Sequence, residues 1–206
     1  QGGDDAFVRM WTPDGAVAWT DQFGTPEFED VRDLAIDASG AILAVGHSNG
    51  DLFGPSAGSY DVFVRKYRSD GSVAWTRTLG TADDDYVGGV AIAEGGDVVV
   101  TAATDGVLGA SSSGGRDVAV RRFAPDGSTV WTRQFGSPAD DAPAGVAVTP
   151  ADEIVVTGST DGALAGPAAG DEDGFVRKLS AAGSTIWTRQ FGTAAEDRPW
   201  GVAVNG

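Results

Sequence analysis

The sequence predicts an all-β protein in which one small antiparallel sheet is built several times over. Three observations carry this prediction. Tryptophan recurs every 56 residues, at Trp19, Trp75, Trp131 and Trp187, and no insertion or deletion breaks this spacing. Short segments rich in β-branched and aromatic residues alternate with glycine-rich turns. No segment keeps the periodicity of an amphipathic helix, so essentially no helix is expected.

The same spacing links other residue types, which indicates one structural unit repeated along the chain. The recurring positions are Asp5, Asp61, Asp117 and Asp173; Arg9, Arg65, Arg121 and Arg177; Thr20, Thr76, Thr132 and Thr188; Gly24, Gly80, Gly136 and Gly192; and Ala35, Ala91, Ala147 and Ala203.

One unit can be followed along residues 61–116. Its predicted strands are residues 61–67 (DVFVRKY), 72–80 (SVAWTRTLG), 89–93 (GVAIA) and 97–104 (DVVVTAAT). The tight-turn sequence Ser69-Asp70-Gly71-Ser72 joins the first two, and Glu94-Gly95-Gly96 joins the last two. Four short strands joined mostly as hairpins make a small antiparallel sheet.

Such a sheet is not stable alone, because both of its faces are apolar. The segments FVRKY and VAVRRF lack a clean inside/outside alternation, as expected when neighbours cover both faces. Sheets stacked radially around an axis satisfy this requirement, and the sequence therefore predicts a β-propeller with four-stranded antiparallel blades. A parallel β-helix is the alternative, but its coils are usually shorter and its connections do not look like hairpin turns.

Composition excludes several functional classes. The 206 residues contain no cysteine, which excludes disulfides, zinc–thiolate sites, iron–sulfur clusters and cysteine nucleophiles. The formal net charge of −16 argues against binding nucleic acid or anionic membranes through phosphate contacts. No stretch approaches the about 18 apolar residues of a membrane span. No signal peptide is visible, as expected for a mature product or a fragment.

The repeat motif closely resembles the bacterial SBBP repeat, which is named for a seven-bladed β-propeller. The motif appears here as D-x-F-V-R-K followed by G-x-x-x-W-T-R-Q-F-G in residues 173–192, as G-V-A-V in residues 201–204, and as V-V-T-G-x-T-D-G-x-L-x-G in residues 155–166. Departures are Leu79 and Ala119 in place of Phe, and Met10 in place of Lys. The G-V-A-V hairpin also looks like an NHL-type blade opening.

The resemblance implies an order of strands within each blade. G-V-A-V is innermost, followed by V-V-V-T, then D-V-F-V-R-K-Y, and the Trp-containing strand is outermost. The recurrent alanines then lie where the blades converge on the axis, and the large tryptophans fill the wider gaps further out.

This order divides the chain into blades. Residues 1–31 supply the two outer strands of one blade; residues 32–87, 88–143 and 144–199 are full blade repeats; and residues 200–206 supply the first strand of the next. At 56 residues per repeat the chain covers about 3.7 blades. We expect a partial propeller, cut at both ends from a longer array, with seven blades in the complete ring.

The recurrent polar residues have structural interpretations beside functional ones. The tryptophans are expected to pack between blades; the Gly-x-x-x-Trp portion also resembles the docking motif of PQQ-type propellers. The arginines could form an anion-binding ring, but the favoured interpretation is that their stems pack between blades while the guanidinium pairs with Asp or a carbonyl. The recurrent Asp61 and its equivalents are expected to bond loop amides, with metal ligation as the alternative.

The acidic residues are concentrated in connections that share one face of the blades. Their clusters could hold Ca²⁺, which takes about six to eight oxygen ligands. The candidate metal ligands are Asp83, Asp84, Asp85, Asp140, Asp141 and Asp197. Their spacing does not match the EF-hand pattern, and the alternative is a solvated acidic surface with Asx-turns. No other cofactor is expected.

No catalytic constellation is visible. His47 is the one histidine, its repeat equivalents are Ala103 and Ser159, and we expect it at the surface or at a strand end. No isolated Ser–His–Asp pattern, phosphate-cradling loop or nucleotide motif occurs.

The sequence therefore favours a non-catalytic, extracellular or cell-surface module that acts as a scaffold or binds an unknown protein or glycan through its acidic long-loop face. Two alternatives stay open. One is an assembly subunit that self-associates through exposed blade edges. The other is part of a propeller enzyme acting on polysaccharide, with its active site outside this segment.

Overall fold

The computed structural model describes residues 3–205, and within them the protein is entirely β, with fourteen strands and no helix. Three four-stranded antiparallel sheets follow a two-stranded hairpin. The hairpin is β1 (Ala6–Trp11) and β2 (Val17–Phe23). The first sheet comprises β3 (Glu29–Ile36), β4 (Ile42–Ser48), β5 (Asp61–Tyr67) and β6 (Val73–Leu79). The second comprises β7 (Asp85–Ile92), β8 (Val98–Thr104), β9 (Asp117–Phe123) and β10 (Thr129–Phe135). The third comprises β11 (Asp141–Val148), β12 (Ile154–Thr160), β13 (Asp173–Leu179) and β14 (Thr185–Phe191).

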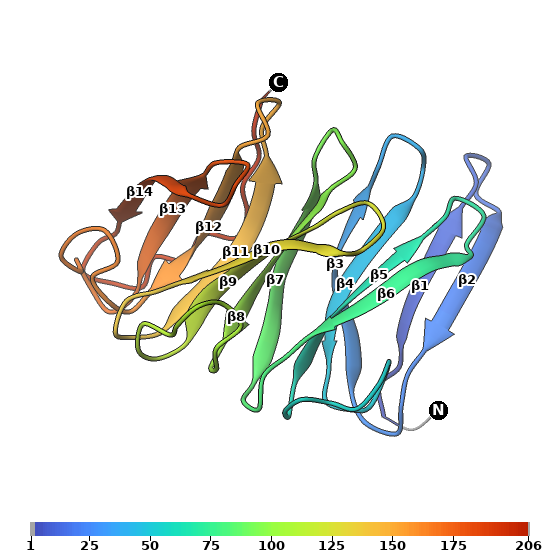
Figure 1. Ribbon diagram of the computed structural model, residues 1–206, viewed down its shortest axis with the longest axis horizontal. Coiled ribbons are helices and arrows are strands. Elements are labelled where there is room, and N and C mark those ends of the chain that lie inside the picture. The colour runs from blue at the N-terminus through green and yellow to red at the C-terminus, as the bar shows by residue number, and fades with distance from the viewer. Residues whose placement is uncertain (1–2, 206) are drawn as a thin grey trace.

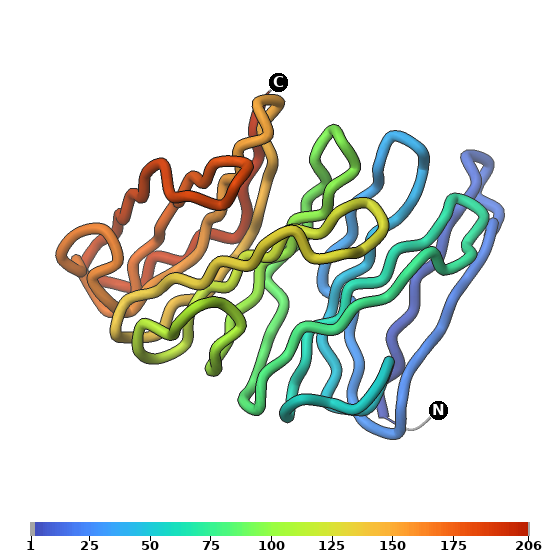
Figure 2. Tube along the Cα trace, viewed as in Figure 1, coloured from blue at the N-terminus to red at the C-terminus, as the bar shows by residue number. Residues whose placement is uncertain are grey.

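Each sheet has its strands side by side in chain order. The hairpin and the three sheets lie next to one another in chain order across the molecule (Figure 1). The chain trace in Figure 2 passes from one sheet directly to the next. Among the first strands, β7 packs against both β3 and β11. The order of the strands within each sheet is the predicted one.

Two ends of the sheets differ in their connections. Short turns join β3 to β4, β7 to β8 and β11 to β12 at one end, at the top of Figure 1. At the opposite end lie the long connections from second to third strands and the connections between sheets. We call this second end the loop face. No helix within residues 3–205 is long and apolar enough to cross a membrane.

Two predicted strand boundaries are wrong. The first strand of each sheet begins several residues earlier than expected, at Asp85 rather than at residue 89 in the second sheet, because a bulge between Val87 and Gly89 lets the ladder continue. Residues 200–204 form no strand. They lie beside β11, with Gly201 next to Gly145, but no second strand is present beside them to complete a ladder within residues 3–205.

The second strands form the centre of the core. All seven residues of β4 and of β8 are buried, because other strands cover both edges and neighbouring sheets cover both faces. One cluster joins Leu43 and Val45 of β4 to Val90 of β7 and Val98 of β8. The faces of one sheet are therefore buried only when the next sheet is present, as the lack of alternation in the sequence predicts.

The recurrent tryptophans connect neighbouring sheets, as predicted. The indole Nε1–H groups of Trp19, Trp75 and Trp131 each donate to a backbone carbonyl in the tight turn of the following sheet. Trp75 reaches the Pro125 oxygen at 2.9 Å, and Trp131 reaches the Ala181 oxygen at 3.0 Å. Trp75 also packs on Phe123, with ring centroids 6.1 Å apart. The tryptophans therefore fix the angle between sheets by a directional bond as well as by apolar area.

Second and third strands show a matched pair of residues within each sheet. Gly46 faces Phe63 in the first sheet, and Gly158 faces Phe175 in the third. A Cβ on Gly46 would lie 2.6 Å from the Phe63 ring, and one on Gly158 would lie 2.8 Å from the Phe175 ring. In the second sheet both positions are alanine, Ala102 facing Ala119. The first strand crowds the same position, since the Cβ would lie 1.9 Å from the Asp30 carbonyl oxygen at Gly46 and 2.1 Å from that of Ala142 at Gly158. Glycine there accommodates both the Phe ring and the first strand.

This pairing predicts a coupled effect of two substitutions. Gly158→Ala should lower the free energy of unfolding by about 1–3 kcal/mol, because the new methyl group meets both the Phe175 ring and the Ala142 carbonyl oxygen. In a Phe175→Ala background the same change should cost less, since the alanine pair of the second sheet is then reproduced. Denaturant unfolding of a double-mutant cycle measures the coupling. Gly166→Ala is the control, because nothing lies within 4 Å of its Cβ position. An equal cost of Gly158→Ala in both backgrounds would contradict the pairing.

Candidate functional site

The recurrent aspartates at the start of the third strands hold the long loops, as predicted. The Asp117 Oδ2 accepts hydrogen bonds from the Ser113 backbone N–H at 2.8 Å and from Gln134 Nε2 at 2.9 Å. Asp173 does the same with Ala169 and Gln190. The loops are therefore shaped by buried carboxylates that accept from backbone amides.

The glutamines are functional parts of this arrangement that sequence reasoning missed. Gln134 Oε1 accepts from the backbone N–H groups of Leu108 and Gly109, each at 2.9 Å, and its Nε2 also donates to the Gly106 carbonyl. Gln190 repeats these contacts one sheet later. The recurring Gln-Phe-Gly segments could have revealed these glutamines. They were missed because the equivalent residue of the first sheet is Thr78, so glutamine does not recur in every repeat.

A second carboxylate begins the first strand of each sheet. Asp85 Oδ2 accepts from the Thr81 backbone N–H at 2.6 Å, and Asp141 Oδ2 accepts from that of Ser137 at 2.5 Å. Glu29 takes this place in the first sheet, and Asp197 takes it after the third. These carboxylates close the connections between sheets.

The two kinds of carboxylate approach each other around a recurrent glycine. A Cβ on Gly136 would lie 2.0 Å from Asp117 Oδ1 and 2.9 Å from Asp141 Oδ2. Burial raises the pKa of the Asp141 carboxyl, and the nearby charge of Asp117 raises it further, while hydrogen bonds from Thr160 and Ser137 offset part of the effect. Burial and the charge of Asp61 raise the pKa of Asp85 in the same way. The recurrence of this glycine follows from the space that the two carboxyl groups need.

The six candidate calcium ligands are distributed among several such contacts. Asp85, Asp141 and Asp197 close the connections between sheets. Asp84 accepts from the Tyr86 hydroxyl at 2.9 Å, and Asp140 accepts from the Arg116 backbone N–H at 2.9 Å. The remaining candidate is Asp83, an exposed residue of the same connection. Within residues 3–205, no three His, Asp or Glu side chains are grouped so that they could hold a metal ion. Calcium binding stays a prediction from the sequence.

The recurrent arginines pack between sheets. The Nε–H groups of Arg121 and Arg177 donate to the hydroxyls of Thr132 and Thr188, each at 2.8 Å. The Arg177 guanidinium lies 3.7 Å from the centre of the Phe135 ring. This confirms the packing interpretation. The predicted aspartate partner occurs at Arg65, which pairs with Asp21 at 3.1 Å, whereas Arg121 and Arg177 bond threonine hydroxyls instead.

An aromatic cluster on the loop face does not follow the repeat. Phe28, His47, Tyr60 and Tyr86 meet where the first and second sheets adjoin, with ring centroids 5.3 Å apart for His47 and Tyr86 and 5.1 Å apart for Tyr60 and Tyr86. Their equivalents one repeat later are Asp84, Ala103, Arg116 and Ala142. The cluster therefore occurs once among the described residues, and comparison of the repeats position by position could have revealed it.

Charged groups surround this aromatic cluster. The Arg116 guanidinium lies 5.3 Å from the Tyr86 ring centre and makes two hydrogen bonds to the Asp105 carboxylate, each 3.0 Å long. Burial lowers the pKa of His47, so the imidazole is neutral at pH 7. The half-buried rings of Tyr60 and Tyr86 lie among loop carboxylates. Such a surface can stack against flat or apolar groups and accept hydrogen bonds or cationic groups at its rim.

A cavity of about 310 Å³ is lined by residues of the first strands β3, β7 and β11, including Val87, which follows Tyr86 in the chain. Four of its lining residues occupy the same position in successive repeats: Arg32, Gly88, Ala144 and Trp200. The residue type at this position therefore changes from repeat to repeat. Trp200 is 89% exposed. Arg32 is paired with Asp30 at 2.7 Å. The aromatic cluster and this cavity therefore both contain residues that depart from the repeat.

Comparisons with known proteins identify no family. No family model matches the chain. The regulatory protein FlaEY of Caulobacter vibrioides is 27% identical over 190 residues, which cover 84% of this chain and 20% of that protein. The chain therefore spans about a fifth of the curated relative that it matches. The SBBP and NHL resemblances stay predictions.

Solved structures with a similar arrangement are distant in sequence. A mutant of the Synechocystis apocarotenoid oxygenase has a TM-score of 0.48 and 11% identity, over 88% of this chain and 44% of that chain. A protein of unknown function from Bacteroides caccae has a TM-score of 0.44 and 12% identity, over 94% of this chain and 77% of that chain.

The raised pKa of Asp85 predicts a pH-dependent difference between the wild type and Asp85→Asn. In the folded protein Asp85 holds its proton above the reference pKa of 3.8, so its contribution to stability is present at low pH and is lost as pH rises through its folded pKa. Asp61 from β5 and Arg121 from β9 are the charges that act on it. Relative to the wild type, the variant should therefore gain stability from pH 3.8 upward and then level off.

Denaturant unfolding at a series of pH values measures this difference. Asp70→Asn is the matched control of opposite sign, because hydrogen bonds from Ser72 lower the pKa of Asp70. That variant should lose stability relative to the wild type as pH rises. Parallel pH profiles for Asp85→Asn and the wild type would contradict the assignment.

The calcium hypothesis has a direct test. A bound ion stabilises the folded state by mass action, so the hypothesis predicts that EDTA lowers the melting temperature and that added Ca²⁺, but not Mg²⁺ at the same ionic strength, restores it. Melting curves recorded with and without chelator test this hypothesis. An unchanged melting temperature would contradict calcium binding by the loops.

Proposed function

We propose that this chain is part of a β-propeller that acts as a non-catalytic binding or scaffold module outside the cell or at its surface. The sheets serve as blades, and the first strands line the axis. The repeated contacts between sheets support this architecture. The same Trp-to-turn hydrogen bond joins the hairpin to the first sheet and each sheet to the next. A constant contact implies a constant angle between blades, which is the condition for a ring.

The loop face is the proposed binding surface, and the aromatic cluster is the observation that carries this proposal. Residues that serve the scaffold recur in each repeat, whereas Phe28, His47, Tyr60 and Tyr86 occur together once in the described chain. His47 lies in β4 and Tyr86 in β7, while Phe28 and Tyr60 lie in the connections that lead into β3 and β5, so their geometry is fixed by the sheets before a partner arrives. The partner is a protein or glycan that stacks on these rings and bonds the surrounding carboxylates.

Glycan and peptide arrays probed with the labelled 206-residue chain test this proposal. Tyr86→Ala should reduce binding to whichever probes the wild type retains by about tenfold or more, since central aromatic anchors dominate such interfaces. Trp11→Ala is the matched control: Trp11 is a 55% exposed aromatic residue at the opposite end of the sheets and should leave binding unchanged. Equal losses for both variants, or retained binding by Tyr86→Ala, would contradict a site at the aromatic cluster.

A further inference from the structure

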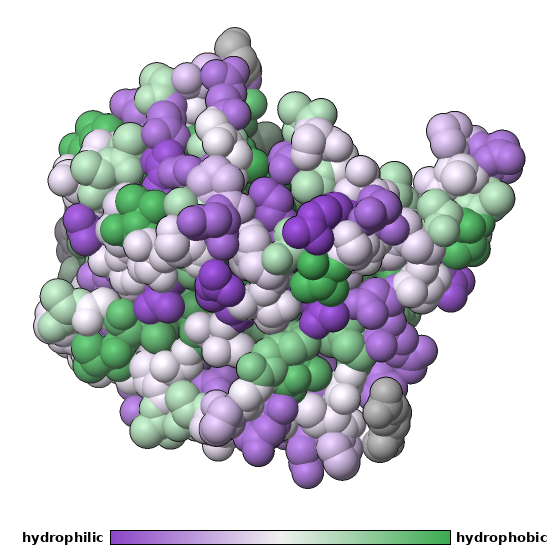
Figure 3. Space-filling view, turned by 45° about the vertical axis from the view of Figure 1, so that its right-hand side comes forward, coloured by the Kyte–Doolittle hydropathy of each residue, from purple (hydrophilic) through white to green (hydrophobic). Residues whose placement is uncertain are grey.

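The one histidine of the chain lies buried at the junction of the first and second sheets. His47 belongs to β4 and is 5% exposed. Leu43 and Val45, which precede it on the same face of β4, form one core cluster with Val90 and Val98 of the second sheet. The imidazole therefore points toward the second sheet. Figure 3 shows that many hydrophilic residues of the molecule reach its surface, whereas His47 is enclosed.

Two tyrosines from different elements enclose the imidazole. Its ring centre lies 5.6 Å from that of Tyr60, in the connection that leads into β5, and 5.3 Å from that of Tyr86, in β7. Both contacts are edge-on, with angles of 79° and 86° between the ring planes. The two tyrosine rings lie 5.1 Å apart. An uncharged imidazole thus packs here as a third aromatic ring and joins the two sheets.

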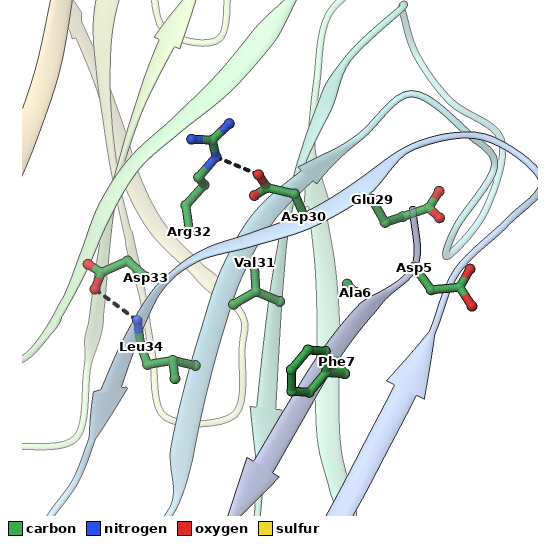
Figure 4. Close-up of a pocket in the computed structure, with 9 residues that line it drawn as sticks. All are labelled: Asp5, Ala6, Phe7, Glu29, Asp30, Val31, Arg32, Asp33 and Leu34. Atoms are coloured by element: carbon green, nitrogen blue, oxygen red, sulfur yellow. Dashed lines mark hydrogen bonds and ion pairs between the residues drawn. The ribbon is translucent and has the colours of Figure 1, made fainter. Parts of the chain in front are cut away.

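Two buried polar atoms near this junction have no hydrogen-bond partner within residues 3–205. They are Nδ1 of His47 and Oδ1 of Asp30. Asp30 in β3 pairs with His47 in the antiparallel ladder, so the two side chains are cross-strand neighbours on the same face of the sheet. The other carboxylate oxygen of Asp30 bonds Arg32 Nε at 2.7 Å, and Figure 4 shows the carboxylate turned toward that side chain. An acceptor without a donor therefore lies on the next strand, beside the imidazole.

Protonation changes what the imidazole needs. The neutral ring has one N–H group and one nitrogen lone pair, whereas the imidazolium has two N–H groups and a positive charge. Burial opposes this charge and lowers the pKa of His47, while the Asp30 carboxylate raises it and the Arg32 guanidinium lowers it further. In its packed position the ring can therefore stay neutral, but it cannot carry a second N–H without finding an acceptor.

The groups on the other elements offer no such acceptor. Tyr60 faces the imidazole from the connection into β5, and Tyr86 faces it from β7. The hydroxyl of Tyr86 donates to Asp84 at 2.9 Å. The Arg116 guanidinium, 5.3 Å from the Tyr86 ring centre, adds a positive charge on the side of the second sheet. The carboxylate on β3 is therefore the partner toward which a protonated His47 is drawn.

We propose that His47 is a pH-sensitive switch at the junction of the first two sheets. In its neutral form it packs against Tyr60 and Tyr86 and keeps the aromatic cluster closed. In mild acid the protonated ring swings to Asp30, where its Nδ1–H donates to Oδ1, and the two tyrosines lose the ring on which both of them pack. The binding surface proposed above is then ordered at neutral pH and loosened in acid. That consequence rests on the proposed function, whereas the switch itself does not.

An NMR titration from about pH 8 to about pH 4 tests the switch, because one histidine gives one set of imidazole signals. The His47 signals should titrate with a midpoint below the reference value of 6.5. The ring signals of Tyr60 and Tyr86 should shift with the same midpoint. Tyr67, the third tyrosine, stacks on Trp19 with ring centres 5.4 Å apart and serves as the internal control, whose signals should not follow this midpoint.

His47→Ser removes the titrating group and is expected to fold, because the third sheet carries Ser159 at the equivalent position. In this variant the shifts of the tyrosine signals should disappear. The melting temperature of the wild type relative to the variant should fall as pH drops below 6.5, since the unfolded chain then binds the proton more readily than the folded protein. Melting curves at each pH also establish that both proteins remain folded during the titration.

Asp30→Asn tests the acceptor. Without the negative charge the imidazolium has no partner, so the midpoint of the tyrosine shifts should move down by about one pH unit or more. Glu27→Gln is the matched control. Glu27 is an exposed carboxylate of the connection that leads into β3, and the charges that act on His47 are Asp30 and Arg32, so its removal should leave the midpoint nearly unchanged.

Three results would overturn the proposal. They are a titration of His47 that leaves the signals of Tyr60 and Tyr86 unchanged, equal midpoints in the wild type and Asp30→Asn, and an imidazole that stays neutral until the whole protein unfolds in acid. All of these measurements are made on the protein without a partner. They do not depend on the array experiment, so the switch and the proposed binding surface can fail separately.

Discussion

The structure depends on one constraint: each four-stranded sheet is apolar on both faces, so it is stable only when a neighbour covers each face. A free sheet of this kind would leave its second strand, the most buried element of the molecule, exposed to water. Stacking satisfies this constraint, and the Trp-to-turn hydrogen bonds fix the angle at which it does so. The loops and the candidate binding surface both take their positions from it.

The carboxylates of the loop face help to hold the same scaffold together. Many carboxylates of this acidic chain accept hydrogen bonds from backbone amides in the loops, as Asp117 and Asp141 do around Gly136. Burying them raises the free energy of their ionised forms, and the amide and hydroxyl donors offset that cost. The loop face is therefore acidic partly because its own construction requires carboxylates. The non-repeated aromatic residues, which no such role explains, are the better indication of a partner.

Repetition explains why so much of the fold could be predicted from the sequence. A strand that is ambiguous once becomes clear when it recurs at a constant spacing, and the strands, the turns and the position of Trp75 between sheets followed from that. The strand order was implied by the resemblance to the SBBP repeat. The start of β7 at Asp85 could not be predicted, because a bulge adds residues to the strand without leaving a mark in the hydrophobic pattern. Residues 200–204 have the sequence of a strand but no ladder, since pairing depends on what lies beside a segment.

The candidate site was harder to predict for the opposite reason. Self-comparison draws attention to what recurs, and the acidic clusters recurred, so Asp83 and Asp140 attracted the metal hypothesis. Tyr60 and Tyr86 are brought together by two different sheets and have no common spacing. Their proximity depends on how the first sheet adjoins the second, and that relation becomes visible only in three dimensions.

The Gly–Phe and Ala–Ala pairs also bear on how such an array can change during evolution. Unequal crossing-over between repeats lengthens or shortens the array, and each exchange joins part of one unit to part of another. A junction falling in the loop between β8 and β9, or between β12 and β13, would place Ala102 opposite Phe175 or Gly158 opposite Ala119, creating a collision in one product and a void in the other. Junctions between one sheet and the next keep each pair intact. Exchange of whole units, with breakpoints outside the second and third strands, is therefore the kind that preserves this packing.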